Sequence, residues 1–484
     1  MSLKKQIKKS GQIYFETHAP DVSLGKAMFT NGVDAFNTPT TPLKKKFFTP
    51  RVIWSFSSAS VVLVGAVVFA LVLNSNTPTG NIDFRGLTAL NTVNFPSDSE
   101  VQALPVSDYY ASSVTKFMNK TAPELYSDET KSFVYSPISA YYALSLLLEG
   151  AKGETYNQLA ALLGVADTDS LHTDSKNLYK NLYYDVTYSS NEGEKKAISK
   201  MGNAVYVNEN QADAVKQSYL DTLASEYYAE AFKTDFSTEG KQGIADWLND
   251  KTNDFLNVQP TDIAASPDTL LALFNTIYLK NSWINGFDTE MNFDDDFTNT
   301  GTGLTQTVTY MRNEFQGAYV DVPGQYSLLA DPLYGGNKVL FVLPADGVSP
   351  KTILSDGTAM KNIVEASQTL ESSTVHLRLP KHKTFNKYLM NDALIANGVT
   401  DVFTDASDLS NIIDSGAAVS SVIQNVGVAF EERGVEAAAY TEVDVYNTAM
   451  PNNEVNFYLD HSFIYVIVSP DNIPLFVGVT NAIE

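Results

Sequence analysis

The chain has 484 residues, of which 44% are hydrophobic and 11% aromatic, and it carries a formal net charge of −23. This composition supplies a large hydrophobic core and excludes disorder of the main body. The absence of cysteine excludes both a disulfide framework and a catalytic thiol, and the negative charge disfavours binding to nucleic acid or acidic polysaccharide.

The N-terminal region predicts a membrane protein. Residues 1–51 are polar, with nine basic and three acidic residues, and we expect them to form a disordered cytoplasmic tail. Residues 52–73 are 22 positions without a charge, long enough for a helix to cross a hydrocarbon core of about 30 Å. Basic residues at 44–46 and Arg51 precede this segment, so the positive-inside rule leaves the N-terminus in the cytoplasm and exports the rest.

A cleaved signal peptide is the alternative to an anchor. The leader of residues 1–51 is long for a signal peptide, and residues 71–73 offer no cleavage site of the small-x-small type. Residues 74–104, rich in Asn, Thr, Ser, Gly and Pro, are expected to be an extracellular linker, and residues 105–484 a single domain. Export without cysteine is compatible with a bacterial surface protein.

The apolar spacing along the domain predicts an α+β fold. Helical spacing covers residues 108–120 and 139–150, whereas residues 339–343 and 463–468 are apolar runs typical of buried strands. Helices crowd the first half of the chain and strands the second, which indicates helices packed on sheets.

Enzyme motifs are missing from the sequence. It contains no His-Glu-x-x-His, Gly-x-Ser-x-Gly, phosphate-loop or dinucleotide motif. The five histidines lie far apart without ligand spacing, so we expect no metal and no cofactor. A Ser-His-Asp triad could still form in three dimensions, because triads are defined by geometry, but nothing in the sequence points to one.

Residues 430–447 have the pattern of a strand with unusual borders. From Val435 onward, apolar or small residues alternate with a side that carries acids and tyrosines, which is typical of a half-buried strand. Yet Gly434 precedes the alternation, three alanines occupy residues 437–439, and residues 446–453 have loop composition. A segment that can be exposed or can become a buried strand is a candidate switch.

This segment resembles the reactive-centre loop of serpins. Residues 431–439 read Glu-Glu-Arg-Gly-Val-Glu-Ala-Ala-Ala, similar to the Glu-Glu-x-Gly-x-Glu-Ala-Ala-Ala hinge of that family. Further serpin-like motifs follow in family order from about residue 105 to the C-terminus. They lie at 133–139, 143–144, 150–155, 158–159, 203–207, 227–236, 275–280 with Trp283 and Phe287, 341–344, 379–381, 408–410, 460–463 and 474–478.

The resemblance implies the serpin fold, with about nine helices on three β-sheets, and a serine protease inhibitor rather than an enzyme. In inhibitory serpins a protease cleaves the exposed loop and forms an acyl-enzyme, and it is trapped when the loop inserts into the central sheet. By this resemblance the hinge comprises Glu432, Gly434, Val435, Glu436, Ala437, Ala438 and Ala439. The sheet-opening region comprises Ser136, Ser139, Asn275 and Gln424.

The resemblance also assigns the bait. Counting the family's interval of sixteen residues from Glu432 gives Thr448 and Ala449 as the reactive bond, with a register good to about two positions. A small Thr448 favours elastase-like or subtilisin-like targets, whereas a bond after Tyr446 would favour chymotrypsin-like ones. We expect a monomer without a heparin-like cofactor, because Lys195 and its neighbouring lysines sit among acids and small residues.

Departures from the family pattern occur at Ser132, Ala245, Gln424, Asn425 and Ser462. Gln424 stands where a histidine usually bonds the asparagine that aligns with Asn275. A Gln amide can still donate and accept there, so we expect altered opening energetics. Lys381 and Glu432 align with a family ion pair. The alternative function is a non-inhibitory serpin-fold protein that acts as a surface binding or scaffold protein.

Overall fold

The computed structural model describes residues 84–190, 193–366, 371–414, 416–435 and 454–483. The expected membrane segment, residues 52–73, and the loop of residues 436–453 lie outside these ranges. Within the described ranges, no helix is both long enough and apolar enough to cross a membrane.

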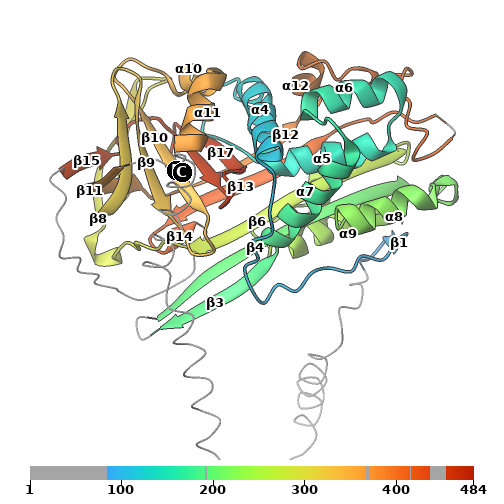
Figure 1. Cartoon of the computed structure of the whole chain (residues 1–484), viewed down its shortest axis with the longest axis horizontal. Helices are drawn as coiled ribbons and strands as arrows, with labels where there is room; N and C mark the ends of the chain where they lie inside the picture. The colour runs from blue at the N-terminus through green and yellow to red at the C-terminus, as the bar shows by residue number, and fades with distance from the viewer. Residues whose placement is uncertain (1–83, 191–192, 367–370, 415, 436–453, 484) are drawn as a thin grey trace, which may run out of the picture. The chain divides into compact units, whose positions relative to one another are not determined.

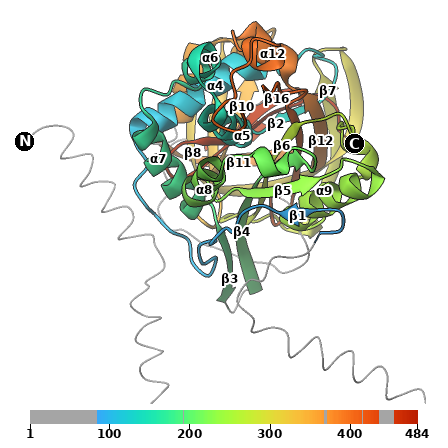
Figure 2. The same cartoon turned by 90° about the vertical axis from the view of Figure 1, so that its right-hand side faces the viewer.

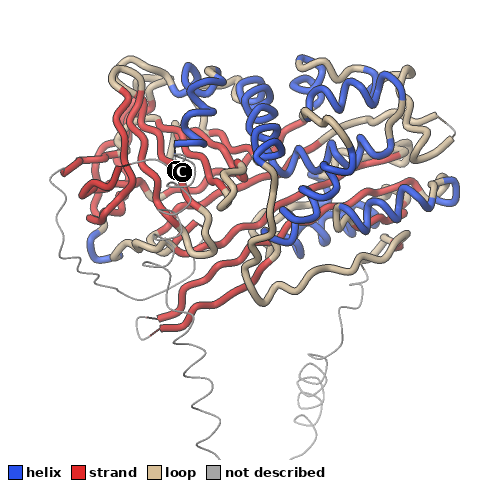
Figure 3. The backbone as a smooth tube through the Cα atoms, in the orientation of Figure 1, coloured by secondary structure: helices blue, strands red, loops and turns tan. Residues whose placement is uncertain are grey.

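Most helices lie in the first half of the domain, and both helices expected from apolar spacing are confirmed. In the described part of the chain there are nine: α4 (Asp108–Leu125), α5 (Pro137–Gly150), α6 (Gly153–Leu163), α7 (Thr168–Asn181), α8 (Gln217–Glu226), α9 (Thr238–Lys251), α10 (Pro350–Ser355), α11 (Gly357–Ala366) and α12 (Asn391–Ala396). Figure 3 shows most of them gathered toward one end of the strands.

Seven strands follow one another across a central sheet, with an eighth beside them. Their order is β1 (Thr88–Ala89), β5 (Glu230–Thr234), β4 (Gly193–Asn208), β6 (Leu271–Ser282), β14 (Gly434–Val435), β13 (Ile423–Glu431) and β12 (His382–Leu389), while β3 (Tyr184–Ser190) pairs with β4. Figure 1 shows the long strands β4, β6 and β13 crossing the molecule.

The remaining strands form one nine-stranded sheet. Their order is β15 (Glu454–Tyr458), β11 (Glu371–Pro380), β8 (Leu304–Val322), β9 (Tyr326–Pro332), β10 (Lys338–Pro344), β16 (Phe463–Val468), β17 (Pro474–Thr480) and β2 (Phe133–Tyr135), with β7 (Phe293–Asn299) on β8. Hydrogen bonding therefore gives two sheets where three were expected. The reason is the length of β8, which pairs with β7 over its first part, with β11 along its middle and with β9 at its end.

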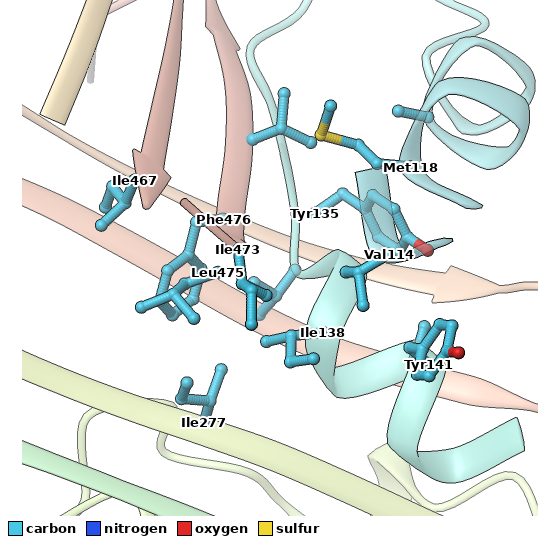
Figure 4. Packing of buried hydrophobic residues seen from close by; sticks show 14 of the residues in the cluster. Val114, Met118, Tyr135, Ile138, Tyr141, Ile277, Ile467, Ile473, Leu475 and Phe476 are labelled. Atoms are coloured by element: carbon cyan, nitrogen blue, oxygen red, sulfur yellow. The ribbon is translucent and has the colours of Figure 1, made fainter. Parts of the chain in front are cut away.

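The main core forms around α5, which is buried along almost its whole length. Its start is fixed by Ser136, whose side chain accepts a hydrogen bond from the backbone of Ser139, and by Pro137 in the first turn. In Figure 4, Ile138 of α5 lies between Ile277 of β6 and Val114 of α4. The helix therefore supports the central sheet from within.

A second cluster of buried side chains joins the outer face of the central sheet to α9. Trp247 of α9 meets Tyr206 of β4 edge-on, with ring centroids 6.1 Å apart. In Figure 2, α9 lies close to β5 and β1. This helix therefore packs against β4, β5 and β6 of the central sheet.

Residues 84–104, expected to be part of a linker, lie along this edge of the domain instead. β1 pairs with β5, and Phe84 and Leu87 are buried in the α9 cluster. Phe95 stacks on Tyr183, with ring centroids 5.9 Å apart. The polar composition of the segment concealed these three apolar anchors. We call residues 84–104 the strap.

The strap should contribute to stability. A protein that begins at residue 105 should unfold at lower urea concentration than one that begins at residue 82, because Phe84 and Leu87 would be lost from the core. At about 1.5 to 3 kcal/mol per buried side chain, the difference is about 3 to 6 kcal/mol. The double variant Phe84→Ala/Leu87→Ala in the longer protein should reproduce most of it. Equal stability of the two proteins would show that the strap does not contribute to the free energy of unfolding.

Candidate functional site

The start of the loop segment is already a strand of the central sheet. Val435 pairs with Asn281 of β6 on one side and with Phe430 of β13 on the other. Its side chain is 2% exposed, which agrees with the inward side of the sequence alternation. The two residues of β14 therefore separate β6 from β13 at this end.

Gly434 permits a very close approach to β6. A Cβ atom on this residue would lie 2.2 Å from the carbonyl oxygen of Asn281 and 2.8 Å from the Cα of Ser282. Any other residue would have to move the strand. Glycine is thus required here by backbone contact rather than by a special dihedral angle.

Further along, β6 and β13 contact each other directly. Leu273 of β6 and Val422, the residue directly before β13, form a parallel bridge, with no strand between them. The central sheet is consequently open at Val435 and closed at Leu273. Figure 1 shows β14 as a short piece at one end of β6.

The turn between β13 and β14 is held by a charged contact. Lys381 Nζ lies 3.0 and 3.1 Å from the two carboxylate oxygens of Glu432, and Asn292 Nδ2 donates to the same group at 2.7 Å. This is the expected ion pair. Burial opposes ionisation of Glu432, but hydrogen bonds from its own backbone, Asn292 and Lys381 outweigh burial and lower its pKa.

Backbone contacts hold the same turn from the continuation of β6. The amide of Trp283 donates to Arg433 O at 2.9 Å, and the amide of Phe287 donates to Glu432 O at 2.8 Å. The indole of Trp283 donates to Glu431 O at 2.8 Å. Trp283 and Phe287 are both buried, as expected for core packing.

The four residues expected at the sheet-opening region do meet beneath the central sheet. Ser139 Oγ donates to Asn275 Oδ1, Asn275 Nδ2 donates to Asn203 Oδ1, and Asn203 Nδ2 donates to Tyr227 O at 2.8 Å. This chain of bonds runs from α5 across β6 and β4. The sequence marked Asn203 only as part of a strand motif, although a buried asparagine opposite Asn275 is a signal for such a bond.

Gln424 plays a different part from the one expected. Its Oε1 accepts from the amide of Ser136 at 3.0 Å and its Nε2 donates to the carbonyl of the same residue at 2.9 Å. Asn275 is meanwhile satisfied by Ser139 and Asn203. Gln424 therefore joins β13 to the start of α5 rather than to β6, because its side-chain oxygen and nitrogen both bond the backbone of Ser136.

The other expected residues lie outside the described ranges. They are Glu436, Ala437, Ala438, Ala439, Thr448 and Ala449. In the part of the chain that the structure describes, no group of three or more His, Asp or Glu side chains is arranged to hold a metal ion. What the described residues supply is a partly open sheet and the contacts that hold it so.

Gln424→Ala should destabilise the domain, because it leaves the buried amide of Ser136 without a partner, whereas the carbonyl of Ser136 still accepts from the amide of Ala140 at 3.2 Å. At about 1 to 3 kcal/mol for one unsatisfied group, a loss of about 1 to 3 kcal/mol in urea unfolding is expected. The matched control is Asn425→Ala, one residue on and on the opposite face of β13. Similar losses in the two variants would contradict the importance of the Gln424 contact.

Comparisons with known proteins agree with this geometry. A family model described as "Serpin (serine protease inhibitor)" matches residues 112–482. The chain is 27% identical to Serpin B4 of Homo sapiens, over 73% of this chain and 94% of that protein. Among solved structures, the native state of the thermophilic serpin tengpin matches with a TM-score of 0.70 at 22% identity, over 82% of this chain and 100% of that one. Thyroxine-binding globulin in complex with thyroxine matches with a TM-score of 0.65 at 23% identity, over 77% and 99%.

Proposed function

Because the chain belongs to the serpin family, we propose that it inhibits serine proteases as a suicide substrate. The observation that carries this proposal is the central sheet, which is open at Val435 and closed at Leu273. A loop that is to become a strand needs a place to start and a gap that can extend. Both are present between β6 and β13.

The registers of β14 support the path of insertion. If both registers continued along the chain, Val443 would come opposite Leu273 on β6 and also opposite Val422, directly before β13. Those two residues form the bridge of the closed part. Insertion would replace one direct bridge by two ladders, over an extension of eight residues or about 27 Å.

The inward side chains of the inserted strand would be small or apolar. By the same registers Ala437, Ala439 and Thr441 would point the same way as Val435, toward α5. Thr441 would come level with Asn275 and Gln424. Since a charged or bulky inward residue would be costly to bury, this composition favours an inserting loop over a rigid one.

Cleavage is what would release the loop. β14 lies in the central sheet, whereas β15, which follows the loop, pairs with β11 in the other sheet. We propose that the protease serine oxygen attacks the carbonyl carbon of Thr448, the bond to Ala449 breaks, and the nitrogen of Ala449 leaves as a protonated amine. Thr448 remains bound to the protease serine as an ester. Insertion of the loop then moves the attached protease before water can hydrolyse that ester.

The bait assignment sets the class of target. Thr448 fits the primary pocket of elastase-like or subtilisin-like enzymes, and use of Tyr446 would indicate chymotrypsin-like enzymes. The non-inhibitory alternative would give clean loop cleavage or no reaction. A serine protease panel distinguishes these, since only the inhibitor forms a complex that survives SDS.

We also propose that the domain is presented outside the cell by residues 52–73. Support comes from the 22 uncharged positions and from the basic residues before them. The exported part has 24 basic and 53 acidic residues, which keeps it soluble and away from nucleic acid.

Val435→Arg should abolish trapping while leaving loop cleavage. The residue is buried between two strands, and an arginine there would cost several kcal/mol without a partner. Insertion should slow so that the acyl-enzyme hydrolyses first, seen as cleaved protein without an SDS-resistant complex. Glu436→Arg, on the opposite side of the alternation, is the matched control and should do much less. Equal loss in both would show that the inward side is misassigned.

Thr448→Arg should bring trypsin-like enzymes into the inhibited set, because their primary pocket carries a complementary acid. Trapping of elastase-like enzymes should weaken. Mass spectrometry of the C-terminal peptide, freed from the complex by denaturation, reads the bond directly. A peptide that begins at Ala449 supports the assignment, and one that begins at Asn447 moves the bait to Tyr446. A start before Val443 would leave too little strand to insert and would rule out the mechanism.

A further inference from the structure

The hairpin of β3 and β4 stands beside the hinge. Val186, Ala197, Asn281, Val435 and Phe430 face one another in a single row across five strands. Beyond this row the hairpin continues past the end of β6, where Tyr188 pairs with Lys195. Figure 1 shows β3 and β4 projecting beyond the other strands at this end of the central sheet.

A buried polar network lies under this row. The hydroxyl of Tyr184 accepts hydrogen bonds from Asn281 Nδ2 at 3.1 Å and from Asn337 Nδ2 at 2.8 Å. Tyr184 and Asn337 are each 1% exposed, and Asn281 is fully buried. We call these three residues the latch.

The latch joins three separate parts of the fold. Tyr184 belongs to β3, Asn281 to β6, and Asn337 to the turn between β9 and β10 of the nine-stranded sheet. Asn281 Nδ2 also donates to the carbonyl of Tyr334 in that turn at 2.7 Å, and its Oδ1 accepts from the amide of Ile198 at 3.1 Å. The end of β6 is thereby bonded to β3 and β4 in its own sheet and to the turn between β9 and β10 in the other sheet.

The surrounding backbone is shaped to the latch. Gly335 has a φ of +84°, and a Cβ atom there would lie 2.9 Å from the Tyr184 hydroxyl and 3.1 Å from Asn281 Nδ2. A glycine is therefore needed both for the turn and for the space that the latch occupies.

The end of β6 has two possible neighbours. It pairs with β14 at Asn281, but it could instead pair directly with the edge of β13, as the opposite end of β6 does beside it at Leu273. Direct pairing would bring β6 toward β13 by about one strand spacing, or about 4.8 Å. The bonds from Asn281 to Tyr184 and to the turn oppose that movement.

We propose that Tyr184 is a positioning residue that holds the end of β6 away from β13 and so keeps Gly434 and Val435 within the central sheet. The placement of the hinge follows from contacts alone. Its functional consequence rests on the proposed inhibitory mechanism. A hinge that is already paired in the central sheet shortens the time the cleaved loop needs to insert, so that insertion competes better with hydrolysis of the acyl-enzyme.

The absence of cysteine allows a direct test. Val435→Cys places a single thiol in β14, between β6 and β13, and the rate of its reaction with a maleimide reports how often the hinge leaves the sheet. Adding Tyr184→Phe keeps the ring and removes only the hydroxyl. Labelling should become about tenfold faster, as expected when buried amides lose a shared acceptor. Tyr188→Phe, on the same strand and face with its ring centroid 5.1 Å from that of Tyr334, is the matched control and should leave the rate unchanged.

A second thiol, in a separate variant, distinguishes hinge release from general loosening. Ser145→Cys lies fully buried in α5, so its labelling should stay slow in the Tyr184→Phe background. Faster labelling of the hinge thiol alone supports the proposal. Unchanged labelling of the hinge thiol, or equal acceleration of both thiols, overturns it.

The inhibitory consequence has its own measurement. With a protease that the parent protein traps, Tyr184→Phe should raise the number of inhibitor molecules consumed per protease trapped, while the total rate of loop cleavage stays the same. If the ratio is unchanged although the hinge thiol is labelled faster, Tyr184 places the hinge but does not affect trapping. If the parent protein traps no protease, the proposed function fails, and the labelling comparison still decides the role of Tyr184.

Discussion

The structure depends on how the facing edges of β6 and β13 find hydrogen-bond partners. The amides and carbonyls of a buried strand edge need partners, which the facing edges of β6 and β13 can find either in a third strand or in each other. At Asn281 and Phe430 the third strand is present, and at Leu273 and Val422 the edges meet directly. Both kinds of pairing occur in one sheet. If a strand is to be inserted, the boundary between them is where the pairing of β6 would have to change.

The contacts around this boundary divide into two groups. One group holds the turn of the hinge from above, through Lys381, Asn292 and the backbone of Trp283. The other ties the sheet to its supports from below, through Gln424 on β13 and the asparagines on β6. None of these contacts lies within the loop itself. If the sheet accepts a strand as we propose, these contacts in the body of the protein would have to hold or adjust as it opens.

The sequence predicted those features that depend on short stretches of chain. Apolar spacing located α4, α5, β10 and β16, and the hinge motif located the turn at Glu432, whereas its partner Lys381, 51 residues away, was indicated only by the serpin resemblance. The missed features depend on pairs far apart in the chain: Tyr184 and Asn281 are separated by 97 residues, and Gln424 and Ser136 by 288. A lone tyrosine or glutamine has no periodicity that marks it as buried or bonded. The strap was missed for the opposite reason, because a few apolar anchors in a polar segment are outnumbered in any average over its composition.

The order of the strands after the loop determines what a cut would leave behind. β15, β16 and β17 all follow residues 436–453, yet they pair with β11, with β10 and with β2, and β16 and β17 are completely buried. A single break anywhere in the loop would therefore yield two polypeptides that remain one particle, interlocked through a shared hydrophobic interior. Gel filtration would register no loss of mass, although an electrophoretic gel run in detergent would show a large and a small fragment.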